Sequence, residues 1–169
     1  MNIDVIYGLP SRVMAELSSQ LFKHEHLSKM LFYTDKKYEK ESILNQKKIS
    51  WSKLKDKNIF VGRRVPIVLK ISGAFISFRV FNCYPHSTGA GIGNVEIDVD
   101  IIVHKDCLNT IHGARDIVIV EMVNEALMNI DMSTLGRVKV LETYDIRDIP
   151  IEYSGYTVKF MVQGFVNYK

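Results

Sequence analysis

The sequence lacks any apolar run that approaches the roughly 20 residues a membrane-spanning helix needs. Its first residues, MNIDVIYGLPSR, lack the basic start, long apolar stretch and small-residue cleavage site of a secretory signal. Cysteine is also scarce, because only Cys83 and Cys107 occur in 169 residues. We therefore expect a protein that is made in the cytoplasm, whose cysteines stay reduced and act as small buried apolar residues.

A strong excess of one charge is missing too, since 22 basic residues face 19 acidic ones and the net charge is +3. Dedicated nucleic-acid binders rely on concentrated positive charge, so this balance argues against that class. The charges are nevertheless unevenly distributed. The stretch 36–64 is strongly basic, whereas NVEIDVDI at 94–101 carries three acids and no base. Such asymmetry is typical of subunits that meet each other, or of a charged channel.

Length and composition predict one domain, because 169 residues with 47% hydrophobic side chains can bury a core without disulfides or metals. Within 1–169 we expect three parts. Residues 1–33 carry leucines at helical spacing and predict a helix, or a helix pair with a break near His24. Residues 34–65 are polar and lysine-rich, and predict a basic excursion that acts as an interaction arm. Residues 66–169 predict the core.

Alternating apolar residues predict strands after residue 66. In VEIDVDIIV at 95–103 one face is apolar and the other carries Glu96, Asp98 and Asp100, which we call the acid row. The period becomes helical over 108–130 and alternates again over 137–144 and 155–166. The predicted fold is α+β, a mostly antiparallel sheet with helices packed on one face. Its central strand places Val95, Ile97, Val99 and Ile101 under a helical stripe of Val118, Met122 and Ala126.

This order of elements resembles the tail-terminator and head–tail joining family of tailed phages, over about residues 66–168. The resemblance lies in an acidic strand, a helix, a strand after glycine, an acidic-apolar link and a closing strand: VEIDVDIIVHKD, ARDIVIVEMVNEALMNI, LGRVKVLETY, DIRDIPIEY and SGYTVKFMVQGFV. Members of that family form rings, commonly hexameric, that cap a tail tube or bridge head and tail. No residue in the pattern is catalytic.

The resemblance implies a non-enzymatic structural subunit of a phage neck or tail ring, which joins or completes head and tail during virion assembly. It would form a homo-oligomer of six or more copies in the virion, after synthesis in the host cytoplasm. Its partners would be adjacent portal, adaptor or tail proteins, with DNA passing through the channel without sequence recognition. The resemblance implies no membrane, metal or cofactor.

Two groups of residues are candidate interface sites. We expect residues 34–64 to be disordered in the isolated subunit and ordered on assembly, because so few apolar side chains cannot offset the entropy of ordering. The acid row predicts either a solvated strand face paired with Arg79 or Lys70, or a subunit contact or channel wall. The full set of expected interface residues is Trp51, Tyr38, Ile49, Leu54, Arg63, Arg64, Glu96, Asp98 and Asp100.

Two other classes of function are open at this point. EIDVDII followed by DIVIVE resembles the core of metal-dependent nucleases, with Glu121 as a metal ligand. However, Val123 stands where those enzymes have lysine, and the helical period around Glu121 opposes a strand. The lysine-rich arm, interleaved with Tyr33, Tyr38 and Trp51, also has the composition of a single-strand nucleic-acid binder.

Overall fold

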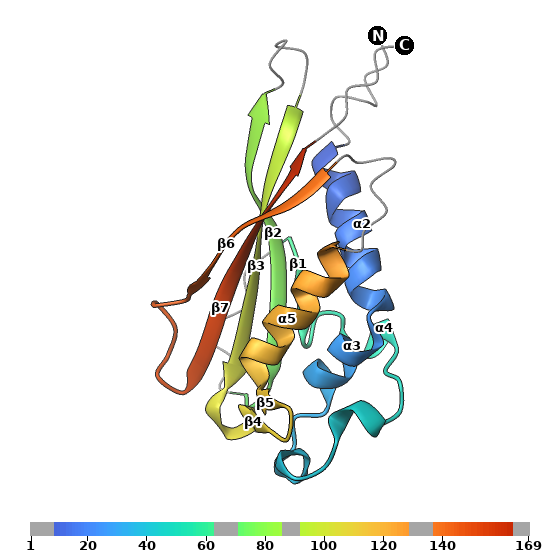
Figure 1. Cartoon of the computed structure of the whole chain (residues 1–169), viewed down its shortest axis with the longest axis vertical. Helices are drawn as coiled ribbons and strands as arrows, with labels where there is room; N and C mark the ends of the chain where they lie inside the picture. The colour runs from blue at the N-terminus through green and yellow to red at the C-terminus, as the bar shows by residue number, and fades with distance from the viewer. Residues whose placement is uncertain (1–8, 63–70, 86–91, 129–136, 164–169) are drawn as a thin grey trace.

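The computed structural model describes residues 9–62, 71–85, 92–128 and 137–163 (Figure 1). A five-stranded sheet has the strand order β1-β2-β3-β7-β6, and β1 alone runs parallel to its neighbour. The strands are β1 Ile59–Val61, β2 Ala74–Pro85, β3 Ile92–His104, β6 Arg137–Asp145 and β7 Tyr153–Gln163. The predicted α+β class with a mostly antiparallel sheet is confirmed.

The two cysteines differ in their burial. Cys107 is buried, as predicted, whereas Cys83 is exposed on β2, so the prediction is wrong for that residue.

Helices α2, α3 and α5 pack on one face of this sheet, which we call the inner face (Figure 1). They span Leu9–Lys23, Glu25–Phe32 and Arg115–Met128. Between α2 and α3 the chain breaks at His24, whose Nδ1 accepts a hydrogen bond from the Leu27 N–H at 3.2 Å. The N-terminal part is therefore a helix pair, one of the two predicted forms. No helix in the described ranges is long and apolar enough to cross a membrane.

Strand β3 lies at the centre of the sheet, as the sequence predicts. Val95, Ile97, Val99 and Ile101 are fully buried on the inner face. The β-branched side chains suit a pleated, buried strand, and burying each one stabilises the fold by roughly 1.5–3 kcal/mol.

The covering helix differs from its prediction in both start and phase. Helix α5 begins at Arg115 because residues 109–114 form the small β4–β5 hairpin, Asn109–Thr110 with Gly113–Ala114. Its buried stripe runs through Ile119, Val123 and the predicted Ala126, while the other two predicted residues, Val118 and Met122, are only partly buried. The phase follows from Arg115, which is buried and donates from Nε to the Cys107 carbonyl and from Nη1 to the Met30 carbonyl, both at 2.6 Å. These bonds turn the first helical turn inward.

The described residues of the basic excursion, 34–62, are ordered against the core, so the predicted disorder is wrong. Short helices η1 Lys36–Glu39, η2 Ile43–Asn45 and α4 Trp51–Leu54 carry it toward β1. Apolar side chains from the segment are buried in the main hydrophobic core, namely Tyr38, Ile43, Ile49, Leu54 and Ile59. Their spacing of five or six residues matches neither a helix nor a strand, so a periodicity analysis does not detect them.

Three hydrogen bonds from side chains to backbone carbonyls fasten this segment. Lys29 Nζ donates to the Leu44 carbonyl at 2.9 Å. Asn58 Nδ2 donates to the Leu31 and Ala74 carbonyls at 3.0 and 2.9 Å. Asn58 thereby joins the end of α3 to the start of β2.

We predict that Leu54→Ala lowers the free energy of unfolding by about 2–5 kcal/mol, because it removes a fully buried side chain and leaves a cavity. The matched control, Lys57→Ala, changes an exposed side chain in the same segment and should stay within about 0.5 kcal/mol of the parent. Urea unfolding of the isolated chain measures both. Equally small effects would show that the segment is not part of the folded core.

Candidate functional site

The face of the sheet opposite the helices, the outer face, carries the acid row. Glu96, Asp98 and Asp100 point there because their neighbours in β3 fill the core. All three are buried, with Asp98 only 1% exposed. The prediction of a solvated or partner-facing row is therefore wrong for these residues. Longer side chains on β2, β6 and β7 cover the acid row, and the pairing register of these strands decides where those side chains lie.

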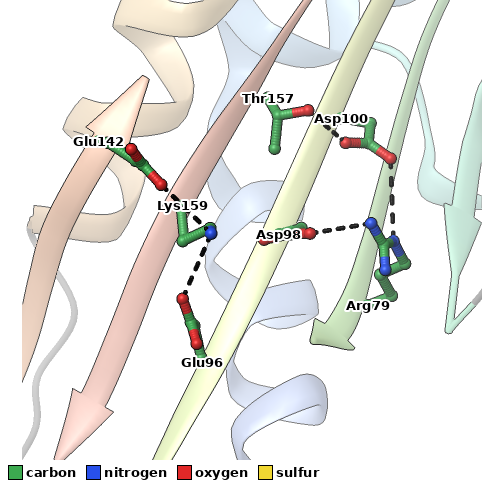
Figure 2. Close-up of polar contacts among 7 residues, drawn as sticks. All are labelled: Arg79, Glu96, Asp98, Asp100, Glu142, Thr157 and Lys159. Carbon is green, nitrogen blue, oxygen red and sulfur yellow. Dashed lines mark hydrogen bonds and ion pairs between the residues drawn. The ribbon is translucent and has the colours of Figure 1, made fainter. Parts of the chain in front are cut away.

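Four charged side chains of alternating sign lie opposite one another across the sheet. In register, Arg79 of β2 faces Asp98 of β3, Asp98 faces Lys159 of β7, and Lys159 faces Glu142 of β6. Figure 2 shows this line, which we call the charge row. Opposite charges directly across from each other stabilise a sheet, at roughly 0.2–1 kcal/mol a pair.

Arg79 holds two of the buried carboxylates. Its Nη2 donates to Asp98 Oδ2 at 2.8 Å, and its Nε lies 3.9 Å from Asp100 Oδ2 (Figure 2). Thr157 Oγ1 donates to the other Asp100 oxygen at 2.7 Å. The predicted pairing of the acid row with Arg79 is thus confirmed, whereas Lys70, the other predicted partner, lies outside the described residues.

Lys159 holds the remaining two carboxylates. Its Nζ lies 3.2 Å from Glu142 Oε1 and 3.5 Å from Glu96 Oε1 (Figure 2). Tyr84 donates its hydroxyl proton to the second Glu96 oxygen at 2.7 Å, and this bond raises the pKa of Tyr84. Four carboxylates therefore share two cations, which leaves this part of the outer face negative.

The surroundings of Asp98 and Lys159 have different effects on the charged forms of the two side chains. Burial raises the pKa of Asp98, although Arg79 and Lys159 oppose this effect. One carboxylate oxygen, Oδ1, has no hydrogen-bond partner among the described residues. Burial by itself would lower the pKa of Lys159, but the bond to Glu142 and the nearby negative charges outweigh it, so this pKa is raised.

Exposed aromatic rings lie over the cations of the charge row. The Phe81 ring centre is 5.7 Å from Arg79 Cζ and 4.8 Å from Lys159 Nζ, and the Tyr144 ring is 5.8 Å from Lys159 Nζ. Phe81 is 52% exposed and Tyr144 41%. Phe81 lies at a shift in the β2–β3 register, between Val80 and Asn82. We missed these rings from sequence, although Phe81 follows Arg79 at strand spacing.

The other half of the outer face is apolar. Phe60, Phe75 and Ile102 form a second buried cluster, against which Ile146 and Ile149 pack from the segment after β6. A cavity of about 420 Å³ lies where this cluster meets the charge row, with Arg79, Asp100 and residues 144–149 in its lining.

Strands β3 and β7 approach closely beside this second cluster. A Cβ on Gly155 would stand 2.5 Å from the Ile101 carbonyl oxygen, so only glycine fits there.

The predicted interface residues of the basic excursion do not form an exposed patch. Tyr38, Ile49 and Leu54 are core residues, which corrects their assignment as partner-facing anchors. Trp51 is half-buried, with its ring packed on Phe22. The short helices around these side chains pack against neighbouring elements, η2 and α4 on α3, and η1 on β4 and on the short helix η3 Lys105–Cys107. Arg63 and Arg64 lie outside the described residues.

The residues suggested for a metal-dependent nuclease do not come together. DIVIVE is helical rather than extended, and Glu121 lies exposed on α5. Since α5 covers the inner face and Asp98 lies on the outer face, the sheet separates the two carboxylates. Within the described ranges, no three His, Cys, Asp or Glu side chains are grouped to hold a metal ion.

Comparison with known protein families places the chain in one of them. The model of a protein family described as YomW matches residues 24–162, which reach from the start of α3 almost to the end of β7. No curated protein matches the chain. The matched range includes every residue of the charge row.

We predict opposite outcomes for two substitutions in the charge row. Arg79→Met should lower the free energy of unfolding by about 3–5 kcal/mol, because it leaves Asp98 and Asp100 buried without their cation. Asp98→Asn should change it by no more than about 1 kcal/mol at neutral pH, because it removes a charge that burial disfavours. Urea unfolding at pH 7 measures both, with exposed Asp145→Asn as the control. Equal losses for both variants would show that the Asp98 charge is itself required.

The same asymmetry predicts a pH dependence. Because the folded-state pKa of Asp98 lies above its ordinary value of 3.8, the protonated form is favoured by folding. The contribution of protonated Asp98 to the free energy of unfolding is complete below about pH 3.8, and it is lost as the pH rises through the folded-state pKa. Asp98→Asn should therefore gain stability relative to the parent as the pH rises toward neutrality. A constant difference between the two proteins from pH 4 to pH 7 would contradict this.

Proposed function

The chain belongs to the YomW family, a family of phage-region proteins from Bacillus, and on that premise we propose that it is a non-enzymatic structural subunit of a phage neck or tail ring. In this role copies of the chain join one another around the DNA channel and contact the adjacent portal, adaptor or tail proteins. The work is mechanical, because the subunit joins or completes head and tail during virion assembly. We expect to find it in the virion, after synthesis in the host cytoplasm.

The observation that carries this proposal is the aromatic cover of the charge row. Exposed Phe81 and Tyr144 lie over Arg79 and Lys159, whose own charges are held by carboxylates. Aromatic residues and arginine are enriched at protein interfaces, where large rigid rings supply contact area at little entropic cost. The charged groups beneath are engaged with one another, an arrangement that suits contact better than bond-breaking chemistry.

The edge of the sheet at β6 supports the same role. This strand is nine residues long, and it pairs with β7 on one side only within the described sheet. Side chains such as Leu141 and Tyr144 are exposed along it. A long open edge with exposed apolar side chains favours pairing with another chain, so a monomer would usually protect it. A subunit that is built to be joined has a use for such an edge.

We predict that the purified chain assembles into a closed complex of several identical copies, and that Phe81→Ser lowers its association constant about tenfold, as expected for a central aromatic contact. Ile117→Ser, which changes an exposed residue on α5, is the matched control and should assemble normally. Native mass spectrometry gives the copy number and the fraction assembled.

The proposed function has two direct counter-tests. The chain should also be found in purified virions by peptide mass spectrometry. A monomer that is absent from virions would contradict the proposal, and so would a Mg²⁺-dependent cleavage of DNA that is lost in Asp98→Ala or Glu121→Ala.

A further inference from the structure

The lysine-rich segment forms a strongly basic surface beside α3 and α4, on the side of the molecule away from β6 (Figure 1). Residues 36–57 contain eight lysines and three acids, a net charge of +5, and all of these charged side chains are exposed. Because the apolar residues between them are fixed in the core, the lysines are held on an ordered surface rather than on a flexible tail. We call this surface the basic edge. It ends two residues before β1, the outermost strand on that side.

The β6 side of the sheet carries the opposite charge. Over residues 142–152 there are four acids and one base, a net charge of −3, and all five side chains are exposed: Glu142, Asp145, Arg147, Asp148 and Glu152. We call this surface the acidic edge. The cavity of about 420 Å³ opens beside it, and its charged lining consists of Asp100, Asp145 and Asp148 together with Arg79 and Arg147.

The alternating charge row ends at the acidic edge. From β2 to β6 the row reads Arg79, Asp98, Lys159 and Glu142, so its last member at the open strand is a carboxylate. The Glu142 side chain is 56% exposed. The next group in such a row would be a cation supplied from beyond β6.

Within one chain the two edges cannot meet, because β1 and β6 are the opposite borders of the same sheet. Figure 1 shows the segment before β1 and the segment after β6 on opposite sides of the molecule. We propose that the acidic edge of one copy binds the basic edge of the next, with lysine side chains of the neighbour extending the charge row and entering the cavity beside Asp145 and Asp148. This inference rests on the proposed ring function and names the contact that builds the ring.

A head-to-tail contact satisfies the charges better than a two-fold one. A two-fold contact through β6 sets the acidic edge against itself, and like charges brought together oppose association. A head-to-tail contact pairs unlike charges and leaves one edge free at each end of the chain of subunits. Closing the ring removes both free ends. Since exposed charges are screened beyond about 8–10 Å at physiological salt, the contact should weaken as salt is added.

Charge reversal tests this contact in the full-length chain. Lys47→Glu/Lys48→Glu/Lys53→Glu/Lys55→Glu changes the net charge of the basic edge from +5 to −3, and Asp145→Lys/Asp148→Lys/Glu152→Lys changes that of the acidic edge from −3 to +3. Each variant should lower the association constant on the order of tenfold or more, because attraction becomes repulsion across the contact. Glu121→Lys/Glu125→Lys, on the exposed side of α5, also makes the net charge more positive and should assemble like the parent. Thermal melts confirm that each variant is folded.

Restoring the charge pairing provides the decisive comparison. A chain with both sets of reversals has edges of −3 and +3, which are complementary again, and should assemble, as should an equimolar mixture of the two variants. Native mass spectrometry in 50–500 mM ammonium acetate, a range chosen to span the screening of exposed charges, reads all of these outcomes.

The possible failures of this proposal and of the ring itself are distinguishable. A parent chain that forms closed rings which neither reversal disturbs would overturn the head-to-tail contact and leave the ring function intact. A parent chain that stays monomeric at every salt concentration would overturn the ring function. If the lysine reversal spares assembly but abolishes binding to a 30-mer single-stranded DNA, the basic edge is a nucleic-acid surface and the proposal is wrong.

Discussion

The structure depends on one constraint, which is that a central strand with acids on one face must be buried on both faces. Helices cover the apolar face of β3, but the described structure places no helix over the acid row. The row is covered instead by its cross-strand neighbours, and Arg79 and Lys159 supply the charge that makes this burial tolerable. Slipping β2 or β7 by one residue would separate these cations from their carboxylates. The same slip would turn apolar residues out of the core, so packing and electrostatics specify one register together.

The charge row also connects the fold to the proposed role. It uses side chains from four neighbouring strands, carries exposed aromatic rings above its cations, and ends in a carboxylate at the open edge of β6. The lysine-rich segment leads into β1 at the opposite border of the sheet, and apolar residues of its short helices anchor it in the core. A subunit of this kind presents a basic and an acidic surface on opposite sides, and neither surface requires a conformational change. Repetition of the contact then yields a closed assembly, provided that the rotation between copies closes.

Sequence patterns predicted the parts of the fold that repeat at regular intervals. Strict alternation over 95–103 identified the central strand and its inner face, and the break at His24 was among the expected forms. Three features depend on contacts that have no period in the sequence. Arg115 sets the phase of α5 through bonds to distant carbonyls, the excursion packs through apolar residues five or six apart, and the acid row is covered by side chains whose register includes a bulge at Val80. The residue types were enough to identify the acid row. They did not predict its environment, because the row is buried rather than exposed to solvent or to a partner.

Zero-length carbodiimide cross-linking of the assembled particle is a direct test of the head-to-tail contact, because it joins only carboxylates and lysines that touch. The particle would be assembled from equal amounts of ¹⁵N-labelled and unlabelled chains, so that peptide masses separate links between copies from links within one copy. We expect cross-links that join a labelled to an unlabelled chain between residues 142–152 of one copy and residues 36–57 of another. Two results would contradict the head-to-tail contact. In one, the two segments are cross-linked only within a single copy. In the other, cross-links between copies form, but they involve neither segment.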